Sequence, residues 1–521
     1  MNSAVTSGNS DAHEDQLRAL QADRSSPLDT RFNRGVVLWL PLVLSAGCGS
    51  GSVKLSDTAP PADATPGEPG GPGGSADTSD SAGTDSATDS ATDTATPPDT
   101  DEACPTYEGA SDPRFDGLLS GLEAYFTGAL PYDGLPSGAS VALVVDGALR
   151  YAGGAGFQSK IGQGRSDRPV DADTRFWIAS TSKWITAVGA MSLVDDGLLD
   201  PDAPVTGLLT DYTESYGRQD DITLHHLLRM KSGLGNDGGC YLMSVSASEW
   251  PDGCARFVSD FDTPLEGMFH PSTLAVPPYD GSLGVYNATL YGAPGAADWL
   301  YSNWGIMLAG RAMEVAAERE FSELIRERVF DPAAMCGAGF TGEAMTGSDN
   351  YALGAGASAI EGYCPEPELG HDCAQPWEPD EIACPGRNPN GGVRASAADL
   401  GRLAEVMLAD LRGEERLLSL ASARRMYCPG GGDPATGCEG RASTGAPTDW
   451  GDTYGYCNFL DTIEGYKVYS HGGGRAGYGA VFRIVPEADF AVVVLGNDEG
   501  VVGSLAPVAD YAMRCFLEDD C

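Results

Sequence analysis

Apolar and polar positions predict β-strands near both ends of the part of the chain that can fold. One pair of apolar, β-branched runs is separated by Asp146-Gly147, which is typical of a β-hairpin with a tight turn. A second pair, near the C-terminus, is separated by Pro486-Glu487. The four expected strands are 140–145, 148–152, 480–485 and 490–495.

Between these strands, apolar residues recur mainly with helical spacing. The expected helices are 182–196, 223–231, 304–319, 321–329, 396–411 and, after the last strand, 503–517. This order predicts an α/β fold of the α+β type: an antiparallel sheet built from N- and C-terminal strands, flanked by helices, with an inserted, mainly helical region. Two long irregular stretches, 235–300 and 336–390, are expected to be surface insertions pinned by cysteines.

The chain before residue 104 predicts export rather than a folded core. The apolar run 36–44 is too short to span a bilayer, follows Arg31 and Arg34, and is followed by small residues and Cys48, as in a secretory signal. This pattern resembles the lipobox of bacterial lipoproteins, which implies a leader over 1–48, lipidation of Cys48 and anchoring to the bacterial cell envelope. A signal peptide with a coincidental cysteine is the alternative.

Residues 49–103 contain no aromatic side chain and include the repeats TDSA-TDSA-TDTA at 84–95. Such a stretch buries too little apolar surface to offset its ordering entropy, so we expect a disordered, acidic linker. The remaining residues, 104–521, are then the single folded domain.

The net charge of the chain excludes two classes of binding partner. The 75 acidic and 32 basic residues give a net charge of −43, which repels nucleic acid and anionic lipid. Membrane contact is therefore expected only through a lipid anchor.

After Cys48, twelve cysteines remain, and an even number in an exported chain favours disulfides. The easiest pairings are Cys240/Cys254, Cys428/Cys438 and Cys515/Cys521. No CxxC or Cys/His cluster suggests a metal, and no cofactor is expected.

Ser180 and Lys183 are the first candidate catalytic pair. Among the five lysines, only Lys183 has a serine three positions earlier, and a helical pattern follows at once. Residues three apart on a helix share a face, so the amine can activate the hydroxyl, while the helix N-terminus offers N–H groups to an oxyanion. The alternative is a capping serine beside a solvated lysine.

Two further elements strengthen this hypothesis. Tyr301 and Asn303 place a phenol and a carboxamide at the start of the expected helix 304–319. His471 opens a run of glycines just before the strand 480–485, where backbone N–H groups at a sheet edge are free. Taken singly, Tyr301 could be a tyrosine of the core and His471 a residue of a turn. Chance, however, rarely produces the serine–lysine pair, the Tyr–Asn element and the His–Gly element in this order.

With these motifs the sequence resembles the serine hydrolase superfamily of class C β-lactamases, D,D-carboxypeptidases and related esterases, whose signature is S-x-x-K, then Y-x-N, then K-T-G or H-x-G. Supporting segments include 173–176, 222–228 and 390–392, and the resemblance covers most of 115–517. A second Y-x-N, at 456–458, lies in an expected strand close to His471 and is rejected in favour of Tyr301.

The resemblance implies an acyl-enzyme mechanism. Ser180 would attack an acyl carbonyl, Lys183 and Tyr301 would share the general-base role, and His471 would assist proton transfer. Asn303 would hold the lysine and the substrate, and backbone N–H groups of Ser180 and Gly474, in the run that includes Gly473, would bind the oxyanion. Because burial lowers the pKa of a lysine, we expect neutral Lys183 rather than a tyrosinate to be the working base.

One departure from the signature bears on the substrate. Penicillin-hydrolysing relatives often have Thr or Ser in the middle of the third motif, where this chain has Gly472, so an efficient β-lactamase is disfavoured. Arg475 could restore a carboxylate contact or be a surface residue. We therefore expect a monomeric esterase or D,D-peptidase acting on a small-molecule or peptide acyl substrate. The alternatives are a catalytically silent ligand-binding or adhesion lipoprotein of the same fold and an α/β-hydrolase, against which the missing G-x-S-x-G motif speaks.

Overall fold

The computed structural model describes nine separate stretches of the chain. They are 138–159, 167–209, 222–234, 299–340, 350–354, 389–438, 453–475, 477–497 and 502–518, with a few isolated positions. The leader predicted at 1–48 with Cys48, the linker at 49–103 and most of the two irregular stretches lie outside these residues. No helix among the described stretches is long and apolar enough to cross a membrane.

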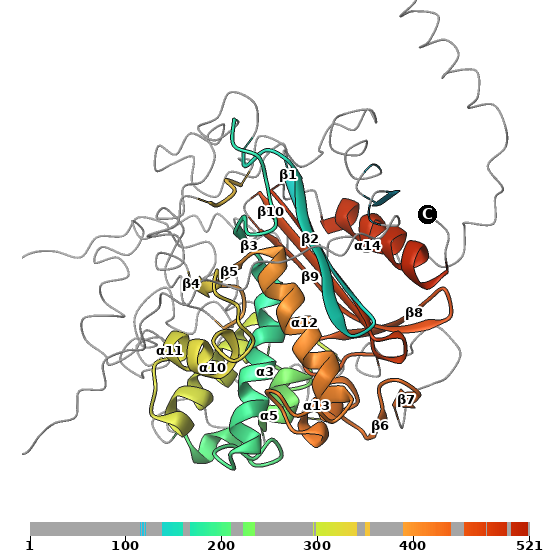
Figure 1. Ribbon diagram of the computed structural model, residues 1–521. Helices are drawn as coiled ribbons and strands as arrows, with labels where there is room; N and C mark the ends of the chain where they lie inside the picture. The colour runs from blue at the N-terminus through green and yellow to red at the C-terminus, as the bar shows by residue number, and fades with distance from the viewer. Residues whose placement is uncertain are drawn as a thin grey trace, which may run out of the picture. The chain divides into compact units, whose positions relative to one another are not determined.

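A six-stranded antiparallel sheet combines strands from both ends of the domain (Figure 1). Its order is β2-β1-β11-β10-β9-β8, so the N-terminal hairpin pairs with the C-terminal strands through β1 and β11. This arrangement confirms the predicted fold class. The strands are β1 (Gly138–Val145), β2 (Ala148–Gly156), β8 (Phe459–Ile463), β9 (Tyr466–Arg475), β10 (Tyr478–Val485) and β11 (Phe490–Gly496).

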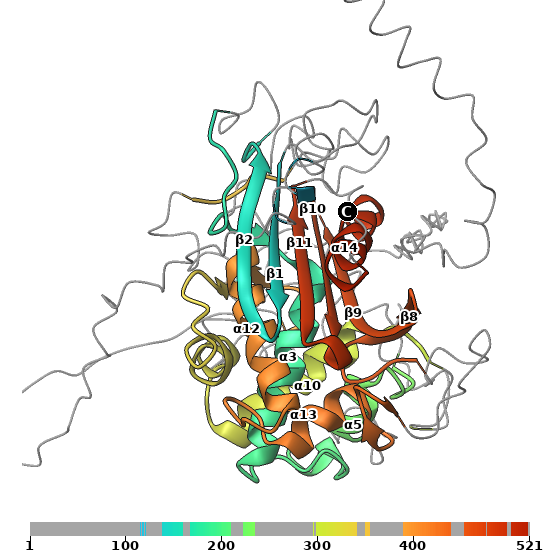
Figure 2. The same ribbon diagram turned by 45° about the vertical axis from the view of Figure 1, so that its right-hand side comes forward.

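The two faces of the sheet carry two separate cores. Along β11 every residue is buried, and side chains alternate: Ala491, Val493 and Leu495 join one apolar cluster, whereas Val492 and Val494 join the other. Because successive side chains of a strand point to opposite faces, a sheet covered on both sides needs such a continuous apolar run. Figure 2 shows the helices that provide the cover, with α14 (Val502–Leu517) on one side and α12 (Ala397–Leu411) on the other.

The remaining helices, like α12, belong to the region inserted between β2 and β8. They are α3 (Ser182–Asp195), α5 (Leu224–Leu228), α10 (Asn303–Ala317), α11 (Phe321–Ile325) and α13 (Leu420–Tyr427). The expected helix 321–329 instead divides into α11 and a π-helical turn over Arg326–Phe330. The other expected helices are present with ends shifted by a few residues at most.

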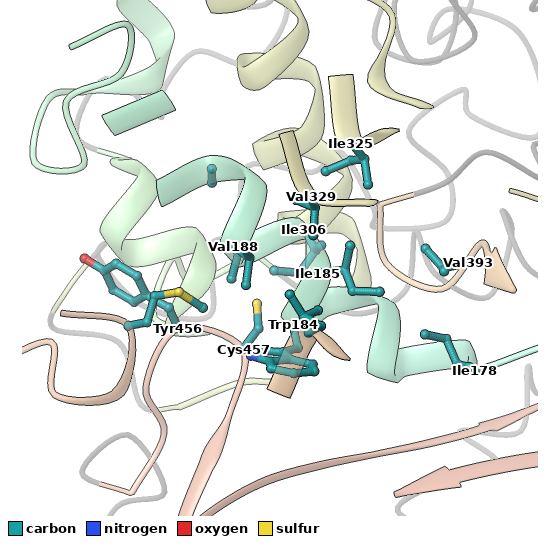
Figure 3. Close-up of a cluster of buried hydrophobic side chains, with 14 of the residues drawn as sticks. Ile178, Trp184, Ile185, Val188, Ile306, Ile325, Val329, Val393, Tyr456 and Cys457 are labelled. Atoms are coloured by element: carbon teal, nitrogen blue, oxygen red, sulfur yellow. The ribbon is translucent and has the colours of Figure 1, made fainter. Parts of the chain in front are cut away.

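Helix α3 lies at the centre of the larger core. Twelve of its fourteen residues are buried, so the helix is buried on all sides rather than amphipathic, as expected for a helix surrounded by protein. Trp184 stacks on Phe482 of β10 with ring centroids 4.3 Å apart. Figure 3 shows the neighbouring side chains Ile185 and Val188 among residues from other elements. This packing fixes the helix that begins just after Ser180.

A small three-stranded sheet brings two distant segments to the start of α3. Its order is β3-β5-β4, from Phe176–Trp177, Val393–Ala395 and Gly339–Phe340. The Ser182 hydroxyl also accepts a hydrogen bond from the Val393 N–H at 3.1 Å. Residues 389–392, which lead into β5, are thereby held beside the first turn of α3.

The cysteines follow the prediction only in part. Cys428 and Cys438 form the expected disulfide, closing the short β6-β7 ribbon (Gly432–Asp433 and Gly437–Cys438) onto the end of α13. Cys457, in contrast, is buried and free, so the even number of cysteines does not mean that all are paired. The pairings Cys240/Cys254 and Cys515/Cys521 involve residues outside the described stretches.

Candidate active site

Ser180 lies in a tight 3₁₀ turn (Ala179–Thr181) that leads directly into α3. The preceding residue, Ala179, has a φ of 45°, a left-handed conformation that is uncommon for a residue with a side chain. The turn keeps the serine partly exposed while its neighbours are buried. Lys183, one turn further on, has its Nζ 3.0 Å from the Ser180 Oγ. The structure thus brings together the pair that the spacing predicted.

Lys183 is completely buried. Its Nζ donates a second hydrogen bond, of 2.6 Å, to the carbonyl oxygen of Asn390. Within the described stretches no carboxylate forms an ion pair with it. Desolvation by burial is therefore the largest effect on the amine, and it lowers the pKa of Lys183 from 10.5 to about 7. This direction agrees with the expectation that neutral Lys183, rather than a tyrosinate, is the working base.

Tyr301 closes the other side of the pair. Its hydroxyl is hydrogen-bonded to Ser180, and the Lys183 Nζ lies 5.0 Å from the centre of its ring. The side chain as a whole is only partly buried, but its hydroxyl end is surrounded by protein. Desolvation therefore raises the pKa of Tyr301 well above 10, so at neutral pH it keeps its proton.

Asn303 is placed by the start of a helix, as predicted. Ser302 caps α10, its hydroxyl accepting the Gly305 N–H at 2.9 Å, and Asn303 is the first residue of that helix. Its side chain is buried, two residues after Tyr301. The contact of Asn303 with Lys183 and with a substrate stays a prediction.

The run His471–Gly474 lies within strand β9, directly before β10, which contains the expected strand 480–485. The pairing of β9 with β8 ends at Ser470, so the following residues have a strand neighbour, β10, on one side only. On the other side lies the turn of Ser180. A Cβ added to Gly473 would lie 2.1 Å from the Ile178 carbonyl oxygen and 3.0 Å from the Ser180 nitrogen. Only glycine allows the two backbones to approach this closely.

His471 lies near Tyr301, with ring centroids 6.3 Å apart, but its nitrogens have other partners. Nδ1 is 2.7 Å from the Gly472 carbonyl oxygen, and Nε2 is 3.2 Å from the hydroxyl of Tyr454. Burial, together with the nearby Lys183 amine, lowers the pKa of His471 to about 3. The imidazole is therefore neutral at physiological pH, which restricts it to holding or relaying a proton without becoming charged.

The rejected second Y-x-N motif lies away from Ser180, and the side chain of the predicted Arg475 lies outside the described residues. Tyr456, from the rejected second Y-x-N, points away from the site: its hydroxyl bonds His225 Nδ1 at 2.8 Å and Arg425 Nε at 2.9 Å. The Asn458 side chain donates to the carbonyl oxygen of Met426 at 3.1 Å. The choice of Tyr301 over this second motif is thus consistent with the geometry.

The sequence did not reveal Tyr454 or the lysine-binding role of Asn390 as parts of the site. Asn390 was noticed only as context, because a backbone carbonyl leaves no signal in residue type. Tyr454 stands two residues before the rejected motif, and an aromatic pair around Gly455 was the only available sign. In the described stretches no group of three His, Cys, Asp or Glu side chains lies close enough together to hold a metal ion.

Fold and site together define a serine hydrolase with the β-lactamase and penicillin-binding protein architecture. The chain belongs to the beta-lactamase family, whose profile matches residues 133–513. It is 28% identical to the esterase EstB of Burkholderia gladioli over 67% of this chain and 89% of that protein. It is 25% identical to penicillin-binding protein 4 of Amycolatopsis lactamdurans over 69% of this chain and 80% of that protein.

Solved structures show the same fold. The octameric penicillin-binding protein homologue from Pyrococcus abyssi has a TM-score of 0.55 at 21% identity, covering 78% of this chain and 77% of its own. The D-amino acid amidase from Ochrobactrum anthropi SV3, in complex with L-phenylalanine amide, has a TM-score of 0.54 at 18% identity, covering 79% of this chain and 100% of its own. At these identities the likeness establishes the architecture alone.

Proposed function

We propose that the chain is an esterase that works through an acyl-enzyme on Ser180. The observation that carries this proposal is the buried Lys183, with a pKa of about 7 and its Nζ 3.0 Å from the Ser180 hydroxyl. A lysine in water is protonated at neutral pH and cannot accept a proton. A lysine that is half neutral, in contact with a serine, is a general base.

The reaction follows from these contacts. Neutral Lys183 accepts the hydroxyl proton as the Ser180 Oγ attacks the ester carbonyl, and the resulting oxyanion lies between the N–H groups of Ser180 and Gly474. The Tyr301 hydroxyl, bonded to Ser180, passes a proton to the departing alkoxide and is reprotonated from Lys183. The alcohol leaves, and the acyl group stays on Ser180. Water then attacks the acyl-enzyme by the same route, releasing the carboxylic acid and restoring the serine.

The third motif favours esters over β-lactams. Gly472 offers no hydroxyl to a substrate carboxylate, and a hydrogen bond to a charged group is worth roughly 1.5–3 kcal/mol, or about ten- to a hundredfold in rate. The similarity to the esterase EstB supports the same choice. Peptides and amides are less reactive acyl donors, and the penicillin-binding protein and amidase relatives make them the principal competitors.

We further propose that the enzyme is a monomer that acts outside the cytoplasm, anchored to the cell envelope through a lipid on Cys48. The basic and apolar pattern before Cys48 supports export. The Cys428–Cys438 disulfide is consistent with an oxidising compartment. Its acyl substrate would then belong to envelope or extracellular material.

Intact-mass analysis after treatment with a fluorophosphonate tests the chemistry. The wild-type chain should gain one adduct, and Ser180→Ala should gain none. Ser192→Ala is the matched control, because its hydroxyl lies further along α3 and donates to the Gly189 carbonyl away from the site; it should still be labelled. A short p-nitrophenyl ester, a D-Ala-D-Ala peptide and nitrocefin, compared side by side, should show fastest turnover of the ester. If neither fluorophosphonate nor penicillin probes label the wild type, the fold serves ligand binding instead.

A further inference from the structure

The oxyanion segment of β9 consists of three successive glycines, Gly472 to Gly474. Glycine has the greatest backbone freedom of any residue, so such a run does not hold its N–H groups in one direction by itself. An oxyanion hole, however, gains its effect from donors that are fixed before the reaction. The residues around the segment must therefore provide the rigidity.

The first brace is the packing of Gly473 against the backbone beside Ser180. A second brace is the imidazole of His471. A carbonyl oxygen only accepts hydrogen bonds, so at the 2.7 Å contact with Gly472 the Nδ1 of His471 must carry the proton and donate it. This bond fixes the peptide group that precedes Gly473, one peptide before the Gly474 N–H.

The tautomer of His471 is in turn set by Tyr454. With Nδ1 protonated, the Nε2 of a neutral imidazole is an acceptor, and the Tyr454 hydroxyl at 3.2 Å donates to it. Desolvation raises the pKa of Tyr454, so this hydroxyl keeps its proton. If the Tyr454 donor were absent, the Nε2–H tautomer would no longer be disfavoured, and in that tautomer His471 has no proton for Gly472.

The Tyr454 ring is itself held in place from several sides. It is fully buried, and its ring centroid lies 4.6 Å from that of Phe459 and 5.5 Å from that of Trp299, both edge-on. Its position follows from the turn that carries it, in which Tyr456 N–H donates to the Met426 carbonyl at 2.7 Å. The hydroxyl of Tyr454 can therefore be removed while the packing of its ring is kept.

From this chain of contacts we propose that Tyr454 is a positioning residue for the acylation of Ser180. Its hydroxyl holds His471 as the neutral Nδ1–H tautomer, and through it the Gly472 peptide that orients the Gly474 oxyanion donor. The proposal rests on the proposed acyl-enzyme function. It also predicts a tautomer preference that exists in the resting protein and can be measured without turnover.

The test compares two variants that each lose one buried phenol oxygen from the same turn. Tyr454→Phe removes the donor to His471, whereas Tyr456→Phe removes a hydroxyl whose partners are His225 and Arg425, outside the site. Second-order rate constants for fluorophosphonate labelling report attack by the Ser180 hydroxyl, which forms a phosphonyl-serine and releases fluoride, with the phosphonyl oxygen in the place of the oxyanion. Nitrogen NMR of ¹⁵N-histidine-labelled protein reports the tautomer, the His471 signals being assigned by their loss in His471→Gln. Melting temperatures check that both variants are folded.

We expect Tyr454→Phe to slow labelling by about 10- to 100-fold, below the loss of a whole oxyanion donor, and to shift His471 away from the Nδ1–H tautomer. Tyr456→Phe should leave both readouts within about twofold of wild type, as expected for a residue that touches neither substrate nor His471. Unchanged labelling in Tyr454→Phe, an unchanged tautomer, or an equal loss in both variants would overturn the proposal. A wild type that takes no probe overturns the proposed function instead, and the tautomer measurement then decides on the Tyr454–His471 coupling alone.

Discussion

The pH dependence of Ser180 acylation is the sharpest prediction of the site, because a single group should control it. Only the neutral amine of Lys183 can accept the serine proton. The rate constant should therefore rise with pH as Lys183 loses its proton and level off above its pKa of about 7. No other described group of the site titrates in this range, since the pKa of His471 is lowered to about 3 and that of Tyr301 is raised.

The magnitude follows from the burial of the amine. At pH 7 a lysine with the ordinary pKa of 10.5 is neutral in about 0.03% of molecules, whereas one with a pKa of about 7 is neutral in about half of them. Burial thus increases the fraction of Lys183 that is neutral, and able to act as a base, on the order of a thousandfold. The low pKa also reduces the free energy of unfolding, because Lys183 binds a proton more tightly in the unfolded chain than in the folded one. This destabilisation is greatest below pH 7 and disappears as the pH rises toward 10.5.

The assay is kcat/KM for a p-nitrophenyl ester, or the labelling rate constant, between pH 5 and 9. We expect a rise of about tenfold per pH unit below 7 and a plateau above it. Lys183→Met should lose at least a thousandfold at pH 7. Lys467→Met is the control, because the Lys467 amine is exposed and donates to the Thr436 carbonyl away from the site; it should keep the wild-type profile.

Three results would refute the reasoning about Lys183. A rate that is flat from pH 5 to 9 would mean that no base titrates in this range. A rise with a midpoint near pH 10 would mean that Lys183 has the pKa of a solvated lysine. A rate that falls as the pH rises would mean that a protonated group is required instead.

Two further predictions concern the close packing at Gly473 and the Cys428–Cys438 disulfide. Gly473→Ala should abolish labelling and lower the free energy of unfolding by about 2–4 kcal/mol, because its methyl group would overlap backbone atoms that cannot move aside. Gly207→Ala, where an added Cβ meets nothing within 4 Å, should change neither labelling nor melting temperature appreciably. Replacing both Cys428 and Cys438 by Ser should cost about 2–3 kcal/mol of stability, measured by urea unfolding, since the bridge closes a loop of about ten residues. We expect the rate constant for Ser180 labelling to stay unchanged. A large fall in that rate constant, alongside the fall in the free energy of unfolding, would contradict a purely structural role for this disulfide.

Local patterns determined much of the fold. The apolar runs at 140–145 and 490–495 became the neighbouring central strands β1 and β11 because strands covered on both faces must be apolar throughout. Strand β9 was missed, and the strand expected around 456–458 begins only at Phe459 (β8), since short polar and glycine-rich segments such as Tyr466–Arg475 have no apolar run of their own. Strand β9 pairs with β10, and β8 pairs with β9, each across a short hairpin, so their strand form depends on these neighbours.

For the site, the sequence determined which residue types were available and which pairs were close along the chain. Ser180 and Lys183 share a helical turn, and that short distance is encoded locally. Only the tertiary structure decided what depends on segments far apart: the burial that lowers the pKa of Lys183, the Asn390 carbonyl that binds it, and the Tyr454 hydroxyl that holds His471. Desolvation and hydrogen bonding act through space, so neither can be deduced from spacing along the chain.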